Sequence, residues 1–166
     1  PSHMRNYSIF SDKIQADGAN IAGVLAALPQ DRKQEVEVIV TRYLKQLPER
    51  DIQRVWTEPV GKFGTDAMLY CEEHWSDNSA TNIVDLRGMS DGTLRFLAII
   101  TALLTQEKYS LLVVEEVDNG LHPSRAHVLI QMLRELAKQR TIDIIVTTHN
   151  PAVLDALGNR MVPFMS

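Results

Sequence analysis

Hydrophobic residues recur along the first part of the chain with the spacing of helices. From Asp31 to Leu47 they repeat at intervals of three and four residues, which predicts an amphipathic helix. A shorter helix is predicted over residues 19–28, because Asn20 can cap its N-terminus and Pro29 closes it. We expect the stripe on the longer helix to face the core; it comprises Val36, Ile39, Val40, Tyr43, Leu44 and Leu47.

The pattern changes between residues 52 and 86 to short apolar runs separated by turn residues. Such runs are typical of strands, and the polar segment at residues 76–79 predicts a tight connection between the last two. We therefore predict a small antiparallel β meander with strands at residues 52–56, 67–72 and 81–86.

From Ser90 onward, predicted helices and strands alternate. The four aliphatic residues at 111–114 form a continuous run, which is typical of a parallel strand covered on both faces. Alternation of this kind predicts an α/β fold, a partial parallel sheet flanked by helices beside the meander. The predicted helices are residues 91–105, 123–139 and 151–157, and the second strand is residues 142–148.

Composition sets broad limits. The chain has 166 residues, of which 45% are hydrophobic, and a formal net charge of -4, so it is large enough for a real core and has no broad attraction to nucleic acid. No apolar run approaches the roughly 18 residues that span a bilayer, and the single Cys71 fits a reducing, cytoplasmic setting. We interpret residues 1–4 as a cloning scar, residues 5–86 as the helical and antiparallel region, and residues 87–166 as the α/β region.

Ser90, Asp91 and Gly92 stand where the predicted helix 91–105 begins. A helix N-terminus offers N–H donors and partial positive charge, and a glycine lets another molecule approach the backbone, so the segment suits a phosphate. Asp91 opposes this, because its carboxylate repels an anion unless it is turned aside.

Two adjacent carboxylates, Glu115 and Glu116, follow the buried strand 111–114 directly. Ligands of open α/β sheets bind at this carboxyl end. Neighbouring residues there point in different directions, so one can help to hold Mg²⁺ while the other faces an attacking water. His149 ends the next predicted strand, and we expect it to face the same crevice as Glu116.

In order and spacing these segments resemble the ABC-type AAA ATPases of the RecF-like, SMC-like and OLD-like branch. The matching runs are Met89-Ser90-Asp91-Gly92-Thr93-Leu94-Arg95-Phe96, Glu115-Glu116-Val117-Asp118-Asn119-Gly120-Leu121-His122-Pro123 and Thr147-Thr148-His149-Asn150-Pro151. They correspond to the signature segment, the Walker B strand with its following loop, and the H-loop. The phosphate-binding loop, G-x-x-x-x-G-K-[ST], is absent from the sequence.

The resemblance implies a divided ATP site. Ser90, Asp91, Gly92 and Thr93 would close over ATP bound by a second protomer, Glu115 would hold Mg²⁺, Glu116 would activate water, and His149 would contact the γ-phosphate. Asp118, Asn119 and His122 match the loop that communicates between the two sites. The expected partners are an N-terminal ATPase half and a second copy in a homodimer or larger assembly, with DNA bound through other regions and no membrane.

The function implied is ATP binding and hydrolysis in bacterial DNA repair or anti-phage defence, with this chain inactive alone. Two alternatives remain open. One is a Mg²⁺-dependent nuclease that uses Glu115, Glu116, Asp118 and His122 as a cation site. The other is a regulatory or assembly domain without turnover.

Overall fold

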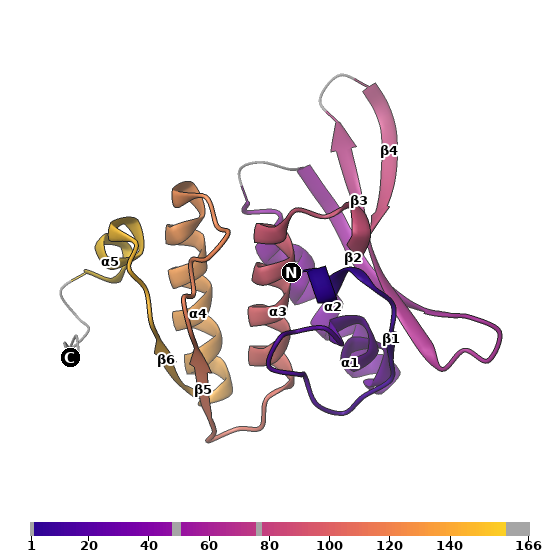
Figure 1. The fold of residues 1–166 in the computed structure, drawn as a ribbon, viewed down its shortest axis with the longest axis horizontal. Coiled ribbons are helices and arrows are strands. Elements are labelled where there is room, and N and C mark those ends of the chain that lie inside the picture. Colours follow the sequence, from indigo (N-terminus) through magenta and orange to yellow (C-terminus); the bar gives the residue numbers. More distant parts are fainter. Residues whose placement is uncertain (1, 48–50, 76–77, 159–166) are drawn as a thin grey trace.

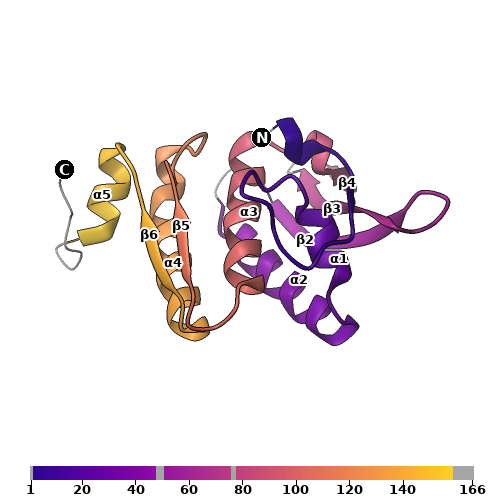
Figure 2. The same cartoon turned by 60° about the horizontal axis from the view of Figure 1, so that its bottom comes forward.

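A computed structural model describes residues 2–47, 51–75 and 78–158. Two layered parts share one long helix, α3, which lies between them in Figures 1 and 2. Residues 76–77 of the predicted turn at 76–79, and residues 159–166 of the predicted α/β region, lie outside the described residues. The helices are α1 Ile21–Ala27, α2 Gln30–Leu44, α3 Asp91–Thr105, α4 Ala126–Arg140 and α5 Pro151–Leu157, and the 3-10 turns are η1 Ser2–Arg5, η2 Leu86–Gly88 and η3 Pro123–Arg125. The strands are β1 Ser8–Ile9, β2 Asp51–Val60, β3 Asp66–Trp75, β4 Asn78–Asp85, β5 Leu111–Val114 and β6 Asp143–Val146.

The predicted meander is confirmed, with strands longer than the sequence indicated. β3 pairs antiparallel with β2 over residues 66–74 and with β4 over residues 70–75, and the short β1 also pairs with β3. Along β2, side chains of α2 occupy backbone donors that a further strand would use. Thr41 Oγ1 accepts from Val55 N–H at 3.0 Å, and Glu37 Oε1 accepts from Thr57 N–H at 2.8 Å. This edge of the sheet is therefore closed to strand addition.

The apolar stripe predicted between Asp31 and Leu47 is core. Val36, Val40 and Tyr43 are at most 1% exposed, and Ile39 packs against the same cluster. Met4, which we had left out of the fold, also belongs to this core at 5% exposure. Asn20 stands at the N-cap of α1 as predicted but does not cap it.

The Asn20 side chain instead ties down the preceding loop, accepting from Gln15 N–H and donating to the Lys13 carbonyl, both at 2.8 Å. Such a bond competes with capping, because the side chain has a single acceptor oxygen.

α3 begins and ends where the sequence predicted, at residues 91 and 105. It is apolar on most sides because it is covered from both directions, by α1 and α2 on one flank and by α4 on the other. Its fully buried side chains include Leu94, Phe96, Leu97, Ile100 and Leu103.

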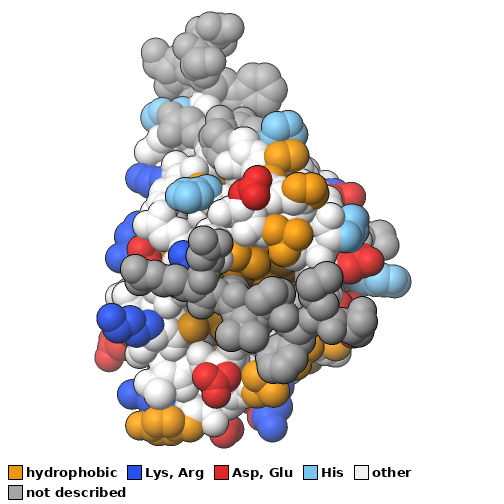
Figure 3. Space-filling model, turned by 90° about the vertical axis from the view of Figure 1, so that its left-hand side faces the viewer, with side chains coloured by type: hydrophobic (Ala, Val, Ile, Leu, Met, Phe, Trp, Pro, Cys, Tyr) orange, Lys and Arg blue, Asp and Glu red, His pale blue; other side chains and the backbone are white. Residues whose placement is uncertain are grey.

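β5 and β6 pair in parallel, with Val114 opposite Val146, and α4 connects them. The prediction that both faces of strand 111–114 are covered is wrong for the described residues. Leu111, Val113 and Ile145 are 52%, 56% and 53% exposed, because helices cover only the face that carries the alternate residues. Figure 3, which views the molecule from the α5 side, shows hydrophobic side chains at the surface among acidic and histidine side chains.

The remaining three elements are present, but two of them differ from their predicted bounds. The helix predicted from Pro123 begins as the 3-10 turn η3 and becomes α-helical only at Ala126. The strand predicted at 142–148 is regular only over 143–146. α5 is confirmed, with Asn150 Oδ1 accepting from Ala152 N–H at 3.0 Å.

A polar contact joins the two parts. The buried Tyr43 hydroxyl on α2 donates to Glu135 on α4 at 2.6 Å. Burial, followed by this hydrogen bond and the carboxylate's charge, raises the pKa of Tyr43 to about 12. The same bond, with a second from Gln131, lowers the pKa of Glu135.

Candidate functional site

The predicted signature segment forms a capped helix start. Ser90 is the N-cap of α3, and its Oγ accepts from Thr93 N–H at 3.2 Å and lies 2.9 Å from Thr93 Oγ1. Thr93 is buried while Ser90 is half-buried. The turn before it is fixed by Asp85, which accepts from Arg87; the Arg87 side-chain hydrogen bond lowers the pKa of Asp85. The hydroxyl of Ser90 thus stays at the surface with a defined orientation.

Asp91 is turned aside. Arg5, which ends η1, forms an ion pair with its carboxylate, with 2.6 Å between Arg5 Nη2 and Asp91 Oδ1. Arg5 Nη1 also donates to the carbonyls of Arg87 and Met89, both at 2.7 Å. The Asp91 charge, which would repel an anion at this helix start, is therefore compensated by Arg5 of the same chain.

The space beside the Gly92 Cα is filled by the chain itself. A Cβ there would lie 2.6 Å from the Gly120 carbonyl oxygen and 2.9 Å from Arg125 Nη1. We had expected the missing side chain to admit another molecule, but it admits the loop at 118–122. Gly120 takes a φ of +77°, a left-handed conformation that favours glycine, to make this approach.

Around this contact lies a hollow of about 590 Å³. It brings together residues from the N-terminal turn, the start of α3 and the loop before α4. They are Arg5, Ser90, Asp91, Gly92, Gly120, His122 and Arg125.

The predicted acidic tip lies beyond β5, and both Glu115 and Glu116 are exposed. Glu116 has a φ of +45°, which is costly for a residue with a side chain and persists only where neighbours hold it. Its N–H donates to Thr147 Oγ1 at 2.9 Å, and Arg95 Nη2 on α3 donates to the carbonyls of Glu115 at 2.6 Å and Glu116 at 2.7 Å.

The loop after the tip makes further contacts. Asn119 Nδ2 donates to the Glu116 carboxylate at 3.2 Å. The buried Asp118 carboxylate accepts from the Thr148 hydroxyl, next to His149. His122 caps η3, with Nδ1 accepting from Ser124 N–H at 3.3 Å.

The structure therefore brings the predicted residues to one end of the β5–β6 unit. Glu116 is bonded to Thr147, and His149 follows two residues later as an exposed side chain. Sequence reasoning missed Arg5, Arg95 and the site role of Thr147. A lone arginine in an otherwise apolar helix was the signal for Arg95.

A cation cluster of the kind that the nuclease alternative needs is not formed. Within residues 2–47, 51–75 and 78–158 there is no group of three or more His, Cys, Asp or Glu side chains that could hold a metal. Asp118 is committed to Thr148, and Glu115 and Glu116 extend as separate exposed groups.

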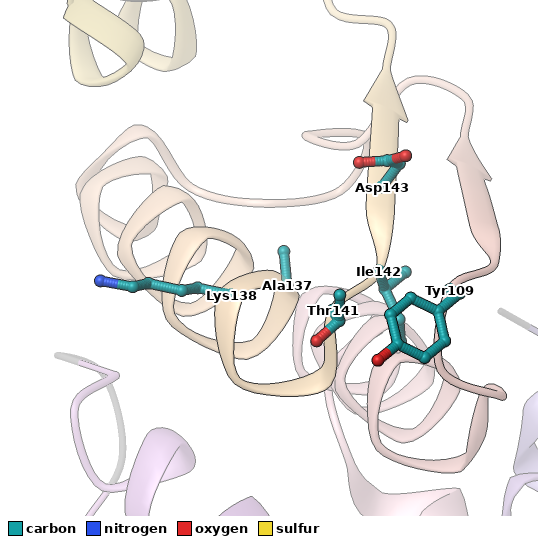
Figure 4. Close-up of a pocket in the computed structure, with 6 residues that line it drawn as sticks. All are labelled: Tyr109, Ala137, Lys138, Thr141, Ile142 and Asp143. Atoms are coloured by element: carbon teal, nitrogen blue, oxygen red, sulfur yellow. The ribbon is translucent and has the colours of Figure 1, made fainter.

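A second hollow, of about 380 Å³, lies at the opposite, amino ends of β5 and β6 (Figure 4). Its lining includes Tyr109 and Thr141, which both have positive φ and are joined by a bond from Tyr109 N–H to the Thr141 carbonyl at 2.8 Å. None of the predicted site residues lines it.

Comparison with known families decides the class. Residues 6–155 match the family described as "AAA domain, putative AbiEii toxin, Type IV TA system". The chain belongs to this AAA domain family. Membership supports a nucleotide-binding protein of the ATPase type. Among curated proteins, no sequence matches.

Solved structures agree on the fold of this AAA domain. An SMC ATPase, from work on ATP-driven dimerization and DNA-stimulated activation, superimposes with a TM-score of 0.55 at 11% identity, covering 74% of this chain and 72% of that one. The Smc head domain from Pyrococcus yayanosii gives 0.53 at 14%, covering 76% and 24%, and an Smc head bound to the C-terminal winged-helix domain of ScpA gives 0.55 at 12%, covering 81% and 43%. The chain thus spans less than half of the latter two proteins.

No helix in the described part of this AAA domain is long and apolar enough to cross a membrane.

Proposed function

We propose that this chain supplies the signature segment, the acidic tip and the switch histidine of an ATPase that sandwiches nucleotide between two protomers. The observation that carries the proposal is that hydrogen bonds from three separate segments of the chain fix Glu116. Arg95 on α3 donates to its carbonyl, Thr147 just after β6 accepts from its N–H, and Asn119 in the following loop donates to its carboxylate. Two of these contacts fix the Glu116 backbone and the third, from Asn119, holds its carboxylate, which suits orientation of a water molecule because positioning supplies most of the catalysis in phosphoryl transfer.

Ser90, Asp91, Gly92 and Thr93 form the surface that meets nucleotide held by the other protomer. The backbone N–H groups of Asp91 and Gly92 in the first turn of α3, together with the half-buried Ser90 hydroxyl, are the donors that we assign to a phosphate oxygen. Gly92 takes part through its backbone and through its contact with the loop at 118–122.

The acidic tip fits Mg²⁺ in the manner of nucleotide sites, where the ion keeps most of its ligands from phosphate and water. Glu115 is the carboxylate that would hold it, and the bound ion would neutralise phosphate charge. Glu116 orients and activates the water, and His149 contacts the terminal phosphate. Asp118, Asn119 and His122 connect this end of the sheet to the signature surface.

The open face of β5 and β6 supports a partner that covers this face of the sheet. Parallel strands are almost always covered on both faces, and Leu111, Val113 and Ile145 are about half exposed here. We assign this face to the polypeptide that carries the phosphate-binding loop, and place the assembled ATPase in bacterial defence or DNA repair.

The test uses a protein that joins this chain to a phosphate-binding loop. Glu116→Gln should abolish phosphate release while ATP-dependent dimer formation persists or increases, because the variant keeps the fold and loses the base. Glu107→Gln is the matched control, since Glu107 is also exposed but lies before β5. Unchanged hydrolysis in Glu116→Gln would show that this residue has no catalytic role and would overturn its assignment, whereas absence of hydrolysis in the joined wild-type protein would favour a regulatory or assembly domain.

A further inference from the structure

Asp91 occupies the first turn of α3, where the helix offers its N–H groups. A carboxylate at this position stabilises the isolated helix but competes with any incoming anion for the same positive end. The surface proposed to receive a triphosphate therefore contains a group that opposes it.

Arg5, which is 86 residues away in sequence, forms an ion pair with the Asp91 carboxylate. Its two terminal nitrogens have different partners. One pairs with Asp91 Oδ1 at 2.6 Å, while the other donates to the carbonyls of Arg87 and Met89. The side chains of Arg5 and Asp91 remain 31% and 58% exposed, so the pair lies at the rim of the hollow and faces solvent.

The charged residues that line the hollow show how the ion pair between Arg5 and Asp91 affects its charge. Its charged residues are Arg5, Arg125 and Asp91, so two positive charges stand against one negative charge. Without Arg5 these charges would sum to zero, and the Asp91 carboxylate would lose its ion pair with Arg5 at the start of α3.

We infer that Arg5 is a positioning residue of the triphosphate-receiving surface, which neutralises Asp91 so that the start of α3 accepts an anion. The inference rests on the proposed function for the identity of the anion, a triphosphate. A purely structural role is the competing explanation, because Arg5 also fixes two loop carbonyls. The two explanations differ in whether removal of the Asp91 charge repairs the loss of Arg5.

The experiment follows binding of inorganic tripolyphosphate to the chain by the backbone amide NMR signals of Ser90 and Gly92. Arg5→Ala should weaken binding about fivefold, as expected for a partly exposed charge. Arg5→Ala combined with Asp91→Asn should restore it to the wild-type level or better. The matched control is Arg87→Ala, which removes an equal charge from the neighbouring turn η2, where the arginine pairs with Asp85.

The salt dependence of binding distinguishes an electrostatic role of Arg5 from a structural one. At about 1 M salt the screening length falls to about 3 Å, so wild type and Arg5→Ala should converge if the effect is electrostatic. A double variant that binds as weakly as Arg5→Ala, or wild-type amides that do not respond to tripolyphosphate, would overturn the inference. Failure of the proposed function has a different signature, namely intact anion binding with hydrolysis that survives Glu116→Gln.

Discussion

Gly92→Ala tests whether the start of α3 and the loop at 118–122 touch. The new Cβ would lie 2.6 Å from the Gly120 carbonyl oxygen, and ordinary contact begins at 3.4 Å, so the loop must retreat by about 0.8 Å. The oxygen belongs to the backbone and cannot rotate away as the end of a flexible side chain could. Arg125 Nη1, at 2.9 Å, must also move.

The free energy of unfolding should fall by a modest amount. Overpacking of this kind costs about 1–3 kcal/mol, while replacement of glycine by alanine within a helix returns about 0.5–1 kcal/mol. The expected net loss is therefore up to about 2.5 kcal/mol, measured as a shift of the urea midpoint at unchanged slope.

Gly120→Ala is the informative control. It meets no atom closer than 3.9 Å, so its cost is the backbone strain at a φ of +77° and not an overlap. Arg125→Lys in the Gly92→Ala background should recover little, because the backbone contact remains. A Gly92→Ala protein as stable as wild type, with unchanged amide shifts at 118–122, would refute the close approach.

Three further predictions follow from contacts described above. Arg95→Met should lower the free energy of unfolding by about 1–3 kcal/mol and speed hydrogen exchange at the tip, since two backbone carbonyls lose their donor; unchanged exchange there would contradict it. Tyr43→Phe should cost about 1–2 kcal/mol at pH 8, and because the folded pKa of Tyr43 is raised to about 12, wild type alone should lose stability between about pH 10 and pH 12, followed by urea denaturation with Glu135→Gln as the companion. Val113→Lys should reduce concentration-dependent self-association in light scattering, whereas Val38→Lys on the exposed side of α2 should not; wild type that stays monomeric at high concentration would contradict it.

Sequence periodicity was sufficient for the elements whose signals are local. The stripe on α2 followed from helical spacing, and both ends of α3 lie where the sequence predicted them. The strand after Thr141 was predicted too long, because β-branched residues favour extended structure even where the ladder has ended.

In the candidate site, too, the residues that belong to a local sequence pattern were predicted and those that depend on long-range contacts were not. Glu116, Asn119 and His149 were found because they sit in runs with characteristic order, although their roles stay predictions. Arg5 could not be found, since its partner Asp91 is 86 residues away and no period links them. The open face of β5 was also unpredictable. An apolar run shows that both faces of a strand are suited to packing, but it does not show whether a helix or another layer covers each face.

The hold on Glu116 depends on three separate elements. A φ of +45° at this residue costs of the order of 1–3 kcal/mol, so it persists because α3, the segment just after β6 and the loop after Glu116 fix it together. Arg95 lies five positions after Ser90 on the rigid helix α3, so a displacement at the signature surface moves the donor that holds the tip. The orientation of the Glu116 carboxylate is therefore set by the relative position of all three elements, and loss of any one contact should release the left-handed conformation.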